Sequence, residues 1–337
     1  MGDRSTPRAL PAFGDCVAPA DFGQPELEYE RLVSAAALVP APWEALLRFE
    51  GRDWRSFLHS LLTQDVNGLP RGASAPAALA DRKGHLLADL WLAAEADADA
   101  GWMRLRRDRL GPVLDVLERH RFSEQVRWSV DETRVCLLLL GPRARDLRAE
   151  LISGPHDLEL DPDRGSLSMA IRETTGGEAA LFLPPPAAAE LLRAQPSAGF
   201  LALERRHLES GVAWYGVEAD SARLVPEAGL TDRISYRKGC YLGQETLARL
   251  HYLGQLNWAL SRFRISVPEG AGLSGKPDLS RPDGERIGWL EAWAPGSGEV
   301  AALGYLHRRF REAPGQILAI GAAEVRWLGE AVPPSQE

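Results

Sequence analysis

The densest collection of chemically different side chains in this sequence lies between residues 236 and 245. The chain there reads Tyr-Arg-Lys-Gly-Cys-Tyr-Leu-Gly-Gln-Glu. It offers a thiol at Cys240, two cations just before it, an amide at Gln244 and a carboxylate at Glu245. Neighbouring cations and a helix that we expect to begin near Gln244 both favour the thiolate form of Cys240. The segment therefore suits nucleophilic or metal-ligating chemistry.

Two glycines in the same segment, Gly239 and Gly243, would let the backbone approach a ligand closely. The alternative interpretation is a tight turn that buries Cys240 as a small hydrophobic residue. That alternative leaves the density of different functional groups unexplained.

A second candidate group is the carboxylate of Glu209. The sequence predicts a helix over residues 201–210 that ends at Gly211, a residue typical of helix C-termini. A carboxylate in the last turn opposes the helix dipole, where a cation would be preferred. Glu209 is therefore either simply exposed or an acceptor placed to face a ligand.

The elements that must position these groups begin with a strand over residues 43–50 and a helix with its N-cap at Asp53. The helix has one apolar face, formed by Phe57, Leu58, Leu61 and Leu62. We expect three strands, a second helix and a closing strand to follow at 77–80, 86–93, 102–105, 110–120 and 126–130.

A similar order of elements recurs in the next part of the chain. We expect a strand over 135–140, in which Cys136 packs as a small hydrophobe, and a helix over 142–151. A hairpin of 167–173 with 178–183 and a helix over 187–194 complete the unit. The repetition predicts two ferredoxin-like α+β units of βαββαβ order.

The remaining stretches of the chain have different characters. Short strand-like runs between Gly/Pro turns predict a small C-terminal β-barrel. The N-terminus has no periodic pattern and reads as a flexible tail. We expect a tail over 1–25, a first α+β domain over 26–132, a second over 133–255 and a barrel over 256–337. Within the second range the chain is able to cross back to the first α+β domain.

Composition restricts the function classes. The chain has 337 residues, 39 Lys plus Arg against 47 Asp plus Glu, and a formal net charge of −8. This charge argues against a general electrostatic grip on nucleic acid, although a local basic patch is compatible with it. No apolar run is long enough for a membrane helix, and no signal peptide is evident, so we expect a cytoplasmic protein. The three cysteines and seven histidines show no metal-site spacing.

The segment around Cys240 resembles the signature of the YgfZ-type folate-binding proteins, and the resemblance covers most of residues 43–256. It is carried by Lys-Gly-Cys-Tyr-Leu-Gly-Gln-Glu at 238–245. Further matching segments, shared with the glycine-cleavage aminomethyltransferases, lie at 49–53, 57–58, 62–66, 81–84, 208–211, 215–216 and 226–230. The C-terminal part matches weakly.

This resemblance implies a ring of three domains around a pocket for tetrahydrofolate or another reduced folate. A pterin presents an N–H beside an exocyclic amine, which one carboxylate accepts in bidentate fashion, and Glu209 matches the family's pterin-binding glutamate. Cys240 is implied as the catalytic group. The other implied folate contacts are Tyr215, Lys238, Gly239, Gln244, Glu245 and Arg249. The family's role implies support of iron–sulfur enzyme assembly or maintenance and, through it, tRNA modification, with iron–sulfur proteins and tRNA-modifying enzymes as partners.

Two alternative functions stay open at this point. An aminomethyltransferase would need the stretch Asn-Ala-x-Asn-x-x-Lys-Asp near residues 102–115, but the only asparagines are Asn67 and Asn257. Asp108 and Asp115 lie in that region without the motif, so whether the chain is an enzyme stays undecided. A direct tRNA-binding protein would use the arginines between Arg104 and Arg109, which otherwise read as a solvated strand end.

Overall fold

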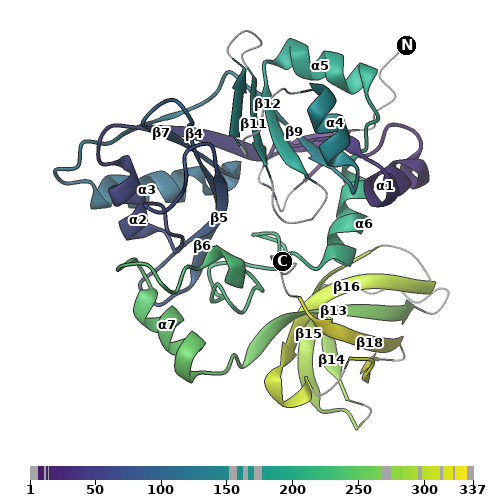
Figure 1. Cartoon of the computed structure of the whole chain (residues 1–337). Coiled ribbons are helices and arrows are strands. Elements are labelled where there is room, and N and C mark those ends of the chain that lie inside the picture. Colours follow the sequence, from purple (N-terminus) through teal and green to yellow (C-terminus); the bar gives the residue numbers. More distant parts are fainter. Residues whose placement is uncertain are drawn as a thin grey trace. The chain divides into compact units, whose positions relative to one another are not determined.

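The computed structural model divides the chain into two compact units, and neither unit is one continuous stretch (Figure 1). Unit 1 comprises Met1–Asp81, Leu87–Leu203 and Asp232–Leu242, and unit 2 comprises Arg82–Leu86, Glu204–Thr231 and Gly243–Glu337. The structure describes residues 7–10, 13, 15–151, 158–161, 166–170, 177–267, 275–281, 283–294, 298–311, 314–321 and 323–331.

The first sheet of unit 1 has the strand order β5-β6-β7-β4-β8 among the described residues. Its strands are β4 (Glu44–Glu50), β5 (Ser74–Ala80), β6 (Leu86–Ala94), β7 (Ala100–Arg106) and β8 (Arg127–Val130). Strand β4 pairs antiparallel with both β7 and β8. Helices α2 (Trp54–Leu61) and α3 (Leu110–His120), with a 3-10 turn at Arg107–Arg109, contribute buried apolar side chains to its core.

The predicted apolar face of α2 is confirmed, because Phe57, Leu58, Leu61 and Leu62 are all buried. Asp53 does occupy the N-cap position, but its carboxylate does not cap the helix. Asp53 Oδ2 instead accepts a hydrogen bond from the Gln125 backbone N–H at 2.7 Å. The residue thereby ties the start of α2 to the segment that enters β8.

The second sheet of unit 1 has the order β10-β11-β12-β9-β3 within the described part of the chain. Its strands are β3 (Ala37–Pro40), β9 (Val135–Leu140), β10 (Leu158–Asp161), β11 (Ser166–Ala170) and β12 (Ala179–Leu183). The predicted hairpin corresponds to β11 and β12, which pair antiparallel, although residues 171–176 of its turn lie outside the described residues. Cys136 on β9 is buried, as predicted, and burial raises the pKa of its thiol well above the ordinary value.

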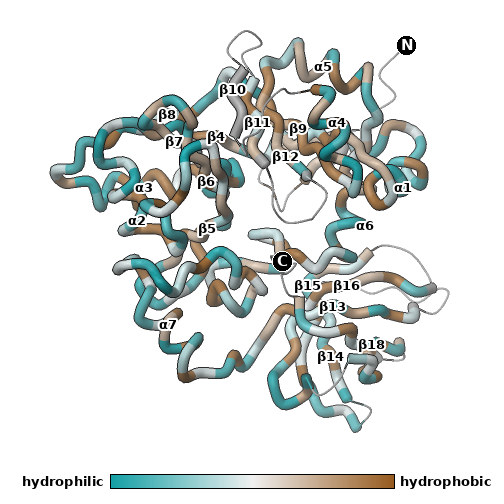
Figure 2. The backbone as a smooth tube through the Cα atoms, viewed as in Figure 1, coloured by the Kyte–Doolittle hydropathy of each residue, from teal (hydrophilic) through white to brown (hydrophobic). Residues whose placement is uncertain are grey.

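Helices α4 (Ala144–Leu151) and α5 (Pro185–Ala194) pack their apolar side chains into the core of the second sheet. Helix α5 alternates between hydrophobic and hydrophilic positions along its length, as an amphipathic surface helix does (Figure 2). Strand β3 precedes the boundary expected at residue 132, yet it pairs antiparallel with β9. The second sheet therefore takes one strand from the part of the chain assigned to the first domain.

Residues 1–25 are not the unattached tail that the sequence indicates, at least where the structure describes them. Strands β1 (Pro7–Ala9) and β2 (Val17–Pro19) pair antiparallel, and α1 (Pro25–Ser34) follows. Phe13 is buried, with its ring centroid 5.1 Å from that of Trp43 and 5.6 Å from that of Phe200. This aromatic cluster attaches the N-terminal segment to unit 1, because aromatic burial is a large favourable contribution.

Unit 2 contains a closed barrel in the order β13-β16-β15-β14-β17-β18. The strands are β13 (Trp258–Val267), β14 (Asp278–Ser280), β15 (Arg286–Trp293), β16 (Gly298–His307), β17 (Ile317–Ile320) and β18 (Ala323–Glu330). A 3-10 turn, Arg308–Phe310, follows β16. The predicted C-terminal barrel is thus confirmed, as is the α+β class with two ferredoxin-like sheets.

Two further helices carry the candidate site residues. Helix α6 (Phe200–Ser210) ends one residue before Gly211, as predicted, and α7 (Gln244–Leu253) begins at the predicted Gln244. Gly211 has φ +78° and Gly243 has φ +79°, which are left-handed conformations that favour glycine. A 3-10 turn at Thr231–Arg233 lies between the two helices.

Candidate functional site

The candidate residues belong to both units. Lys238, Gly239 and Cys240 are in unit 1, whereas Glu209, Tyr215, Gln244, Glu245 and Arg249 are in unit 2. The chain passes from unit 1 to unit 2 between Leu242 and Gly243, inside the signature segment.

In unit 1, the segment 232–238 runs alongside the loop that follows α2. The Thr63 hydroxyl donates to the Arg233 carbonyl oxygen at 2.5 Å and accepts from the Ala78 N–H at 2.9 Å. The Ser235 N–H donates to the Thr63 carbonyl oxygen at 2.9 Å. Two segments that carry the family resemblance, 62–66 and the approach to 238–245, are therefore held together by hydrogen bonds.

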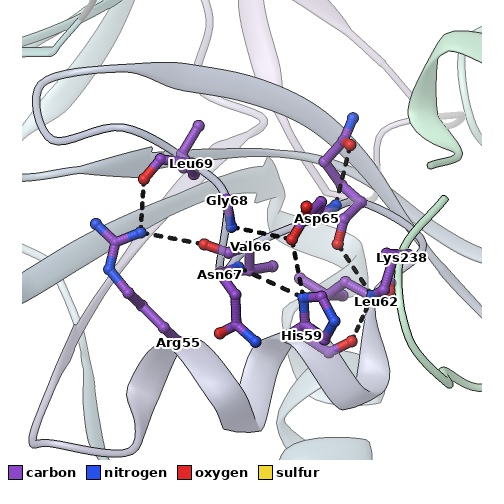
Figure 3. A network of polar contacts seen from close by, with 10 residues as sticks. Arg55, His59, Leu62, Asp65, Val66, Asn67, Gly68, Leu69 and Lys238 are labelled. Atoms are coloured by element: carbon purple, nitrogen blue, oxygen red, sulfur yellow. Dashed lines mark hydrogen bonds and ion pairs between the residues drawn. The ribbon is translucent and has the colours of Figure 1, made fainter.

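Lys238 is the anchor of this arrangement (Figure 3). Its ammonium donates to three backbone carbonyl oxygens, those of His59, Leu62 at 2.7 Å and Gln64 at 3.1 Å. The last carbonyls of a helix lack partners within the helix, so Lys238 satisfies the C-terminal end of α2. Its nitrogen also lies 4.8 Å from the centroid of the Tyr241 ring. Burial lowers the pKa of Lys238 to about 8.

His59 links the end of α2 to the next turn of chain. Its Nδ1 lies 3.2 Å from Asp65 Oδ1, which also accepts from the Gly68 N–H at 2.9 Å (Figure 3). Burial, and then the charge of Lys238, lower the pKa of His59 below its ordinary value. The neutral ring is therefore favoured beside the Lys238 ammonium.

Cys240 follows two residues after this anchor, and its side chain is exposed and reduced. The alternative of a buried structural cysteine is therefore wrong. Gly239 is also exposed, and a Cβ there would lie at an ordinary 3.7 Å from His59 Nε2. The described structure thus supplies no steric reason for glycine at 239. Tyr241 is buried, which raises its pKa to about 12, and its hydroxyl has no hydrogen-bond partner among the described residues.

A buried arginine that the sequence reasoning missed supports the start of the same segment. Arg233 is 1% exposed, and its Nε lies 3.0 Å from Asp89 Oδ1. Its guanidinium also pairs with Asp232 and lies 5.5 Å from the Trp91 ring centroid. Neither Asp89 nor Trp91 is near residue 233 in sequence, so no local signal identified this contact.

In unit 2, Glu209 occupies the last turn of α6. Its side chain is 29% exposed, and Oε1 lies 4.0 Å from Arg264 Nη1 on β13. A Cβ on Gly211 would lie 2.6 Å from Cδ of Arg262, so the turn after Glu209 packs closely on the barrel strand. The carboxylate is thus held near a cation but remains accessible.

The loop that carries Tyr215 is fixed by a buried pair, His207 and Glu218. Glu218 Oε1 lies 3.0 Å from His207 Nε2, and Oε2 accepts from the Trp214 N–H at 2.9 Å. The His207 and Trp214 rings stack at 3.6 Å. Both paired side chains are almost fully buried, so this group holds Tyr215, itself buried, on the end of α6.

Two other segments that carry the resemblance meet in unit 2. The Leu86 N–H donates to the Arg223 carbonyl oxygen at 2.8 Å, and the Val225 N–H donates to the Gly84 carbonyl oxygen at 3.3 Å. The Leu260 N–H on β13 donates to the Glu227 carbonyl oxygen at 2.9 Å. Residues 82–86 and 223–230 therefore pack as one layer on the outside of the barrel.

Helix α7 presents the remaining candidates. Gln244 is half-buried at its first turn, and Glu245 and Arg249 are exposed one turn apart. Glu245, Arg249 and Leu250 line part of an open pocket of about 390 Å³. The pocket brings a carboxylate and a guanidinium to one side of the helix.

The arginines of residues 104–109 do not form an unpaired basic patch. Arg104 binds Glu44 through two hydrogen bonds of 2.8 and 2.9 Å, and Arg106 binds Asp108 through two of 2.9 and 3.0 Å. Arg107 pairs with Glu132 at 3.4 Å, and Arg109 pairs with Asp108 at 3.3 Å. Each of the four arginines is paired with a carboxylate, so the geometry of this cluster does not favour RNA binding through it.

Comparison with known proteins agrees with these features. The chain is 28% identical over 239 residues to the tRNA-modifying protein YgfZ of Shigella dysenteriae serotype 1 (strain Sd197), covering 67% of this chain and 72% of the relative. The same protein of Escherichia coli (strain SE11) is 27% identical over the same shares. The predicted resemblance to the YgfZ type is confirmed. No protein-family model matches this YgfZ-like chain.

The fold of the YgfZ-like chain has a solved counterpart. Glycine cleavage system aminomethyltransferase T of Bartonella henselae matches with a TM-score of 0.81 over 97% of this chain and 94% of that one, at 20% identity. The predicted aminomethyltransferase fold is thus confirmed. Among the residues that the structure describes, no helix has the length and apolar character needed to cross a membrane.

Proposed function

We propose that the chain binds a reduced folate and, in the cytoplasm, supports iron–sulfur enzymes on which tRNA modification depends. The observation that carries the proposal is the packing of the segments that match the YgfZ type. Segments that match the YgfZ type but lie far apart in sequence are held side by side, 62–66 with 233–238 in unit 1 and 82–86 with 223–230 in unit 2. The names of the relatives, tRNA-modifying protein YgfZ, support the link to tRNA.

The described residues fit a pterin at Glu209. A carboxylate that is 29% exposed at a helix end, with one cation 4.0 Å away, is able to accept the paired N–H donors of a pterin. Lys238 does not suit the acidic glutamyl tail, because its three donors already bind backbone carbonyls. We therefore assign the cationic contact to Arg249 and retain Tyr215, Gly239, Gln244 and Glu245 as further candidate contacts.

The aminomethyltransferase alternative receives no support from the aspartates in its expected catalytic region. Asp108 is held by Arg106 and Arg109, and Asp115 is exposed on α3. Both carboxylate oxygens of Asp108 are therefore already engaged by guanidiniums within the protein.

Glu209→Gln is expected to weaken reduced-folate binding at least about tenfold, since a charge-assisted hydrogen-bond pair is replaced by an amide that offers only one acceptor. Titration of the purified chain with several reduced folates, followed by calorimetry, measures the change. Glu204→Gln is the matched control, because it lies on the same helix but about 140° around its axis. Equal affinities for wild type and Glu209→Gln would reject the pterin assignment.

Cys240→Ser is expected to leave the fold and folate affinity unchanged, because the thiol is exposed, while abolishing the support of iron–sulfur enzymes. The measurement is iron–sulfur enzyme activity in cells that lack the native protein and carry the variant. Cys16→Ser provides the control for a general loss of thiol. Full enzyme activity with Cys240→Ser would show that the thiol has no role.

A further inference from the structure

We propose that the outer surface of the barrel in unit 2 binds an unpaired stretch of RNA. The surface, called here the tryptophan–arginine patch, consists of Trp258, Trp289, His307, Arg308 and Arg309. None of its residues is a candidate folate contact, and none belongs to the Arg104–Arg109 cluster.

The aromatic part of the patch is a cluster of three rings inclined to one another by 58° and 76°. Trp258 at the start of β13 lies 4.8 Å from Trp289 on β15 and 4.8 Å from His307 at the end of β16, measured between ring centroids. All three side chains are only half-buried. The apolar interior of the barrel is filled by other residues, among them Phe263, Ile265 and Leu306. The three rings lie outside this interior. Trp289 also stacks on the buried Tyr305 at 5.3 Å, with Arg223 4.9 Å from its centroid, so it supports the cluster, and Trp258 and His307 offer the ring surface on which unpaired bases are able to stack.

The positive charge of the patch is local to an otherwise acidic chain. No Asp or Glu occurs between Glu245 and Glu269, and none between Glu299 and Glu312. Arg308 and Arg309 are exposed. Arg308 Nη1 donates to the neutral Gln255 side chain at 2.8 Å, and Arg309 forms no ion pair with a described residue. This contrasts with the arginines at 104–109, each of which pairs with a carboxylate.

Acidic groups near the patch are already paired with cations. The Trp289 indole N–H donates to Glu291 Oε1 at 2.7 Å, and Lys276 pairs with the same carboxylate. Glu330 pairs with Arg311 at 2.6 Å. Burial and then the charges of Arg309, Arg308 and Arg311 lower the pKa of His307, so the positive potential reaches the ring. A polyanion is the complementary ligand.

The segment that enters the patch adds groups for reading base edges. Residues 251–255 and 257 are exposed, including Tyr252 at 65%, with amides at Gln255 and Asn257. The segment is fixed to the patch, since the Arg308 N–H donates to the Asn257 carbonyl oxygen at 2.8 Å and Arg311 donates to the Leu256 carbonyl oxygen at 2.7 Å. Aromatic rings, amides and arginines together favour an unpaired strand over a duplex, whose bases are not available for stacking.

The test is binding of a fluorescently labelled RNA hairpin with a wide unpaired loop to the full chain, measured by anisotropy at several salt concentrations. We expect binding that weakens steeply with salt and that is at least about tenfold tighter than binding of a fully paired RNA duplex. Trp258→Ala should weaken hairpin binding about tenfold or more, with Trp258→Phe restoring most of it. Arg309→Gln tests the charge without disturbing a buried side chain.

The control variant is Arg107→Gln in the Arg104–Arg109 cluster, where Arg107 already pairs with Glu132; this variant should bind the hairpin as the wild type does. The proposal is overturned if the hairpin does not bind at low salt, if the duplex binds equally well, or if Trp258→Ala and Arg309→Gln are both without effect. An equal loss in Arg107→Gln would also overturn it. The RNA surface does not rest on folate binding, because Glu209→Gln should leave hairpin affinity unchanged and Trp258→Ala should leave reduced-folate affinity unchanged.

Discussion

Lys238→Met should lower the free energy of unfolding by about 3 kcal/mol, because three backbone carbonyl oxygens at and after the end of α2 lose a charged donor. Methionine keeps the length and apolar stem of lysine, so the change isolates the ammonium. Chemical denaturation of the full chain, followed by circular dichroism, measures the effect. Hydrogen exchange should also accelerate in residues 59–65 and 233–241, the two segments that Lys238 joins.

Arg237→Met is the matched control for Lys238→Met. Arg237 is the neighbouring cation but is exposed, so its replacement should change stability by less than about 0.5 kcal/mol. If Lys238→Met keeps full stability but loses folate affinity, then Lys238 serves the ligand rather than the fold. That result would reverse our assignment of Lys238 as an anchor.

The second large effect is expected at Glu218. Glu218→Ala should lower the free energy of unfolding by about 3 kcal/mol, since it leaves the buried His207 ring and the Trp214 N–H without their acceptor. Tyr215 lies between Trp214 and Glu218 in sequence, so the loop that holds it should loosen. Faster hydrogen exchange at the amides of Gly216 and Ala219, measured by mass spectrometry of peptides, would report this loosening.

Glu299→Ala provides the comparison for Glu218→Ala, because Glu299 is an exposed glutamate in the same unit. It should unfold at the same denaturant concentration as the wild type. Equal stability of Glu218→Ala and Glu299→Ala would mean that the buried pair does not hold the loop. A His207→Gln variant should fall between them, because glutamine retains one donor for the carboxylate.

The elements with strong hydrophobic patterns could be predicted from the sequence. The bounds of α3 (110–120) and β9 (135–140) agree with the prediction. Helix α3 has a regular apolar face, and β9 is a continuous apolar run. Helix α1 was missed for a physical reason. Glu28 is buried in it and accepts hydrogen bonds from the N–H groups of Phe22, Gln24 and Gly199, while Val33 is 43% exposed. A buried carboxylate and an exposed valine invert the pattern that marks an amphipathic helix.

The sequence predicted which residues to consider for the candidate site, but not the contacts that they make. The motif around Cys240 predicted a reactive thiol, and the structure places that thiol at the surface, as such chemistry requires. The role of Lys238 was not visible, because its acceptors are backbone carbonyls 174 to 179 residues away, which carry no side-chain signature. The neutralisation of Arg104 by Glu44 was hidden for the same reason, since the two residues meet only across paired strands.

The interleaving of the two units limits how this protein can be divided. Unit 2 is completed by five residues from the first third of the chain and by residues 204–231, which precede the return of the chain to unit 1 at 232–242. A cut before Gly243 would separate the barrel from the loops that form hydrogen bonds with Leu260 and Tyr305. The isolated barrel would therefore lack those loops. No single cleavage point leaves either unit intact. Recombination or fragment expression therefore has to keep the whole polypeptide together.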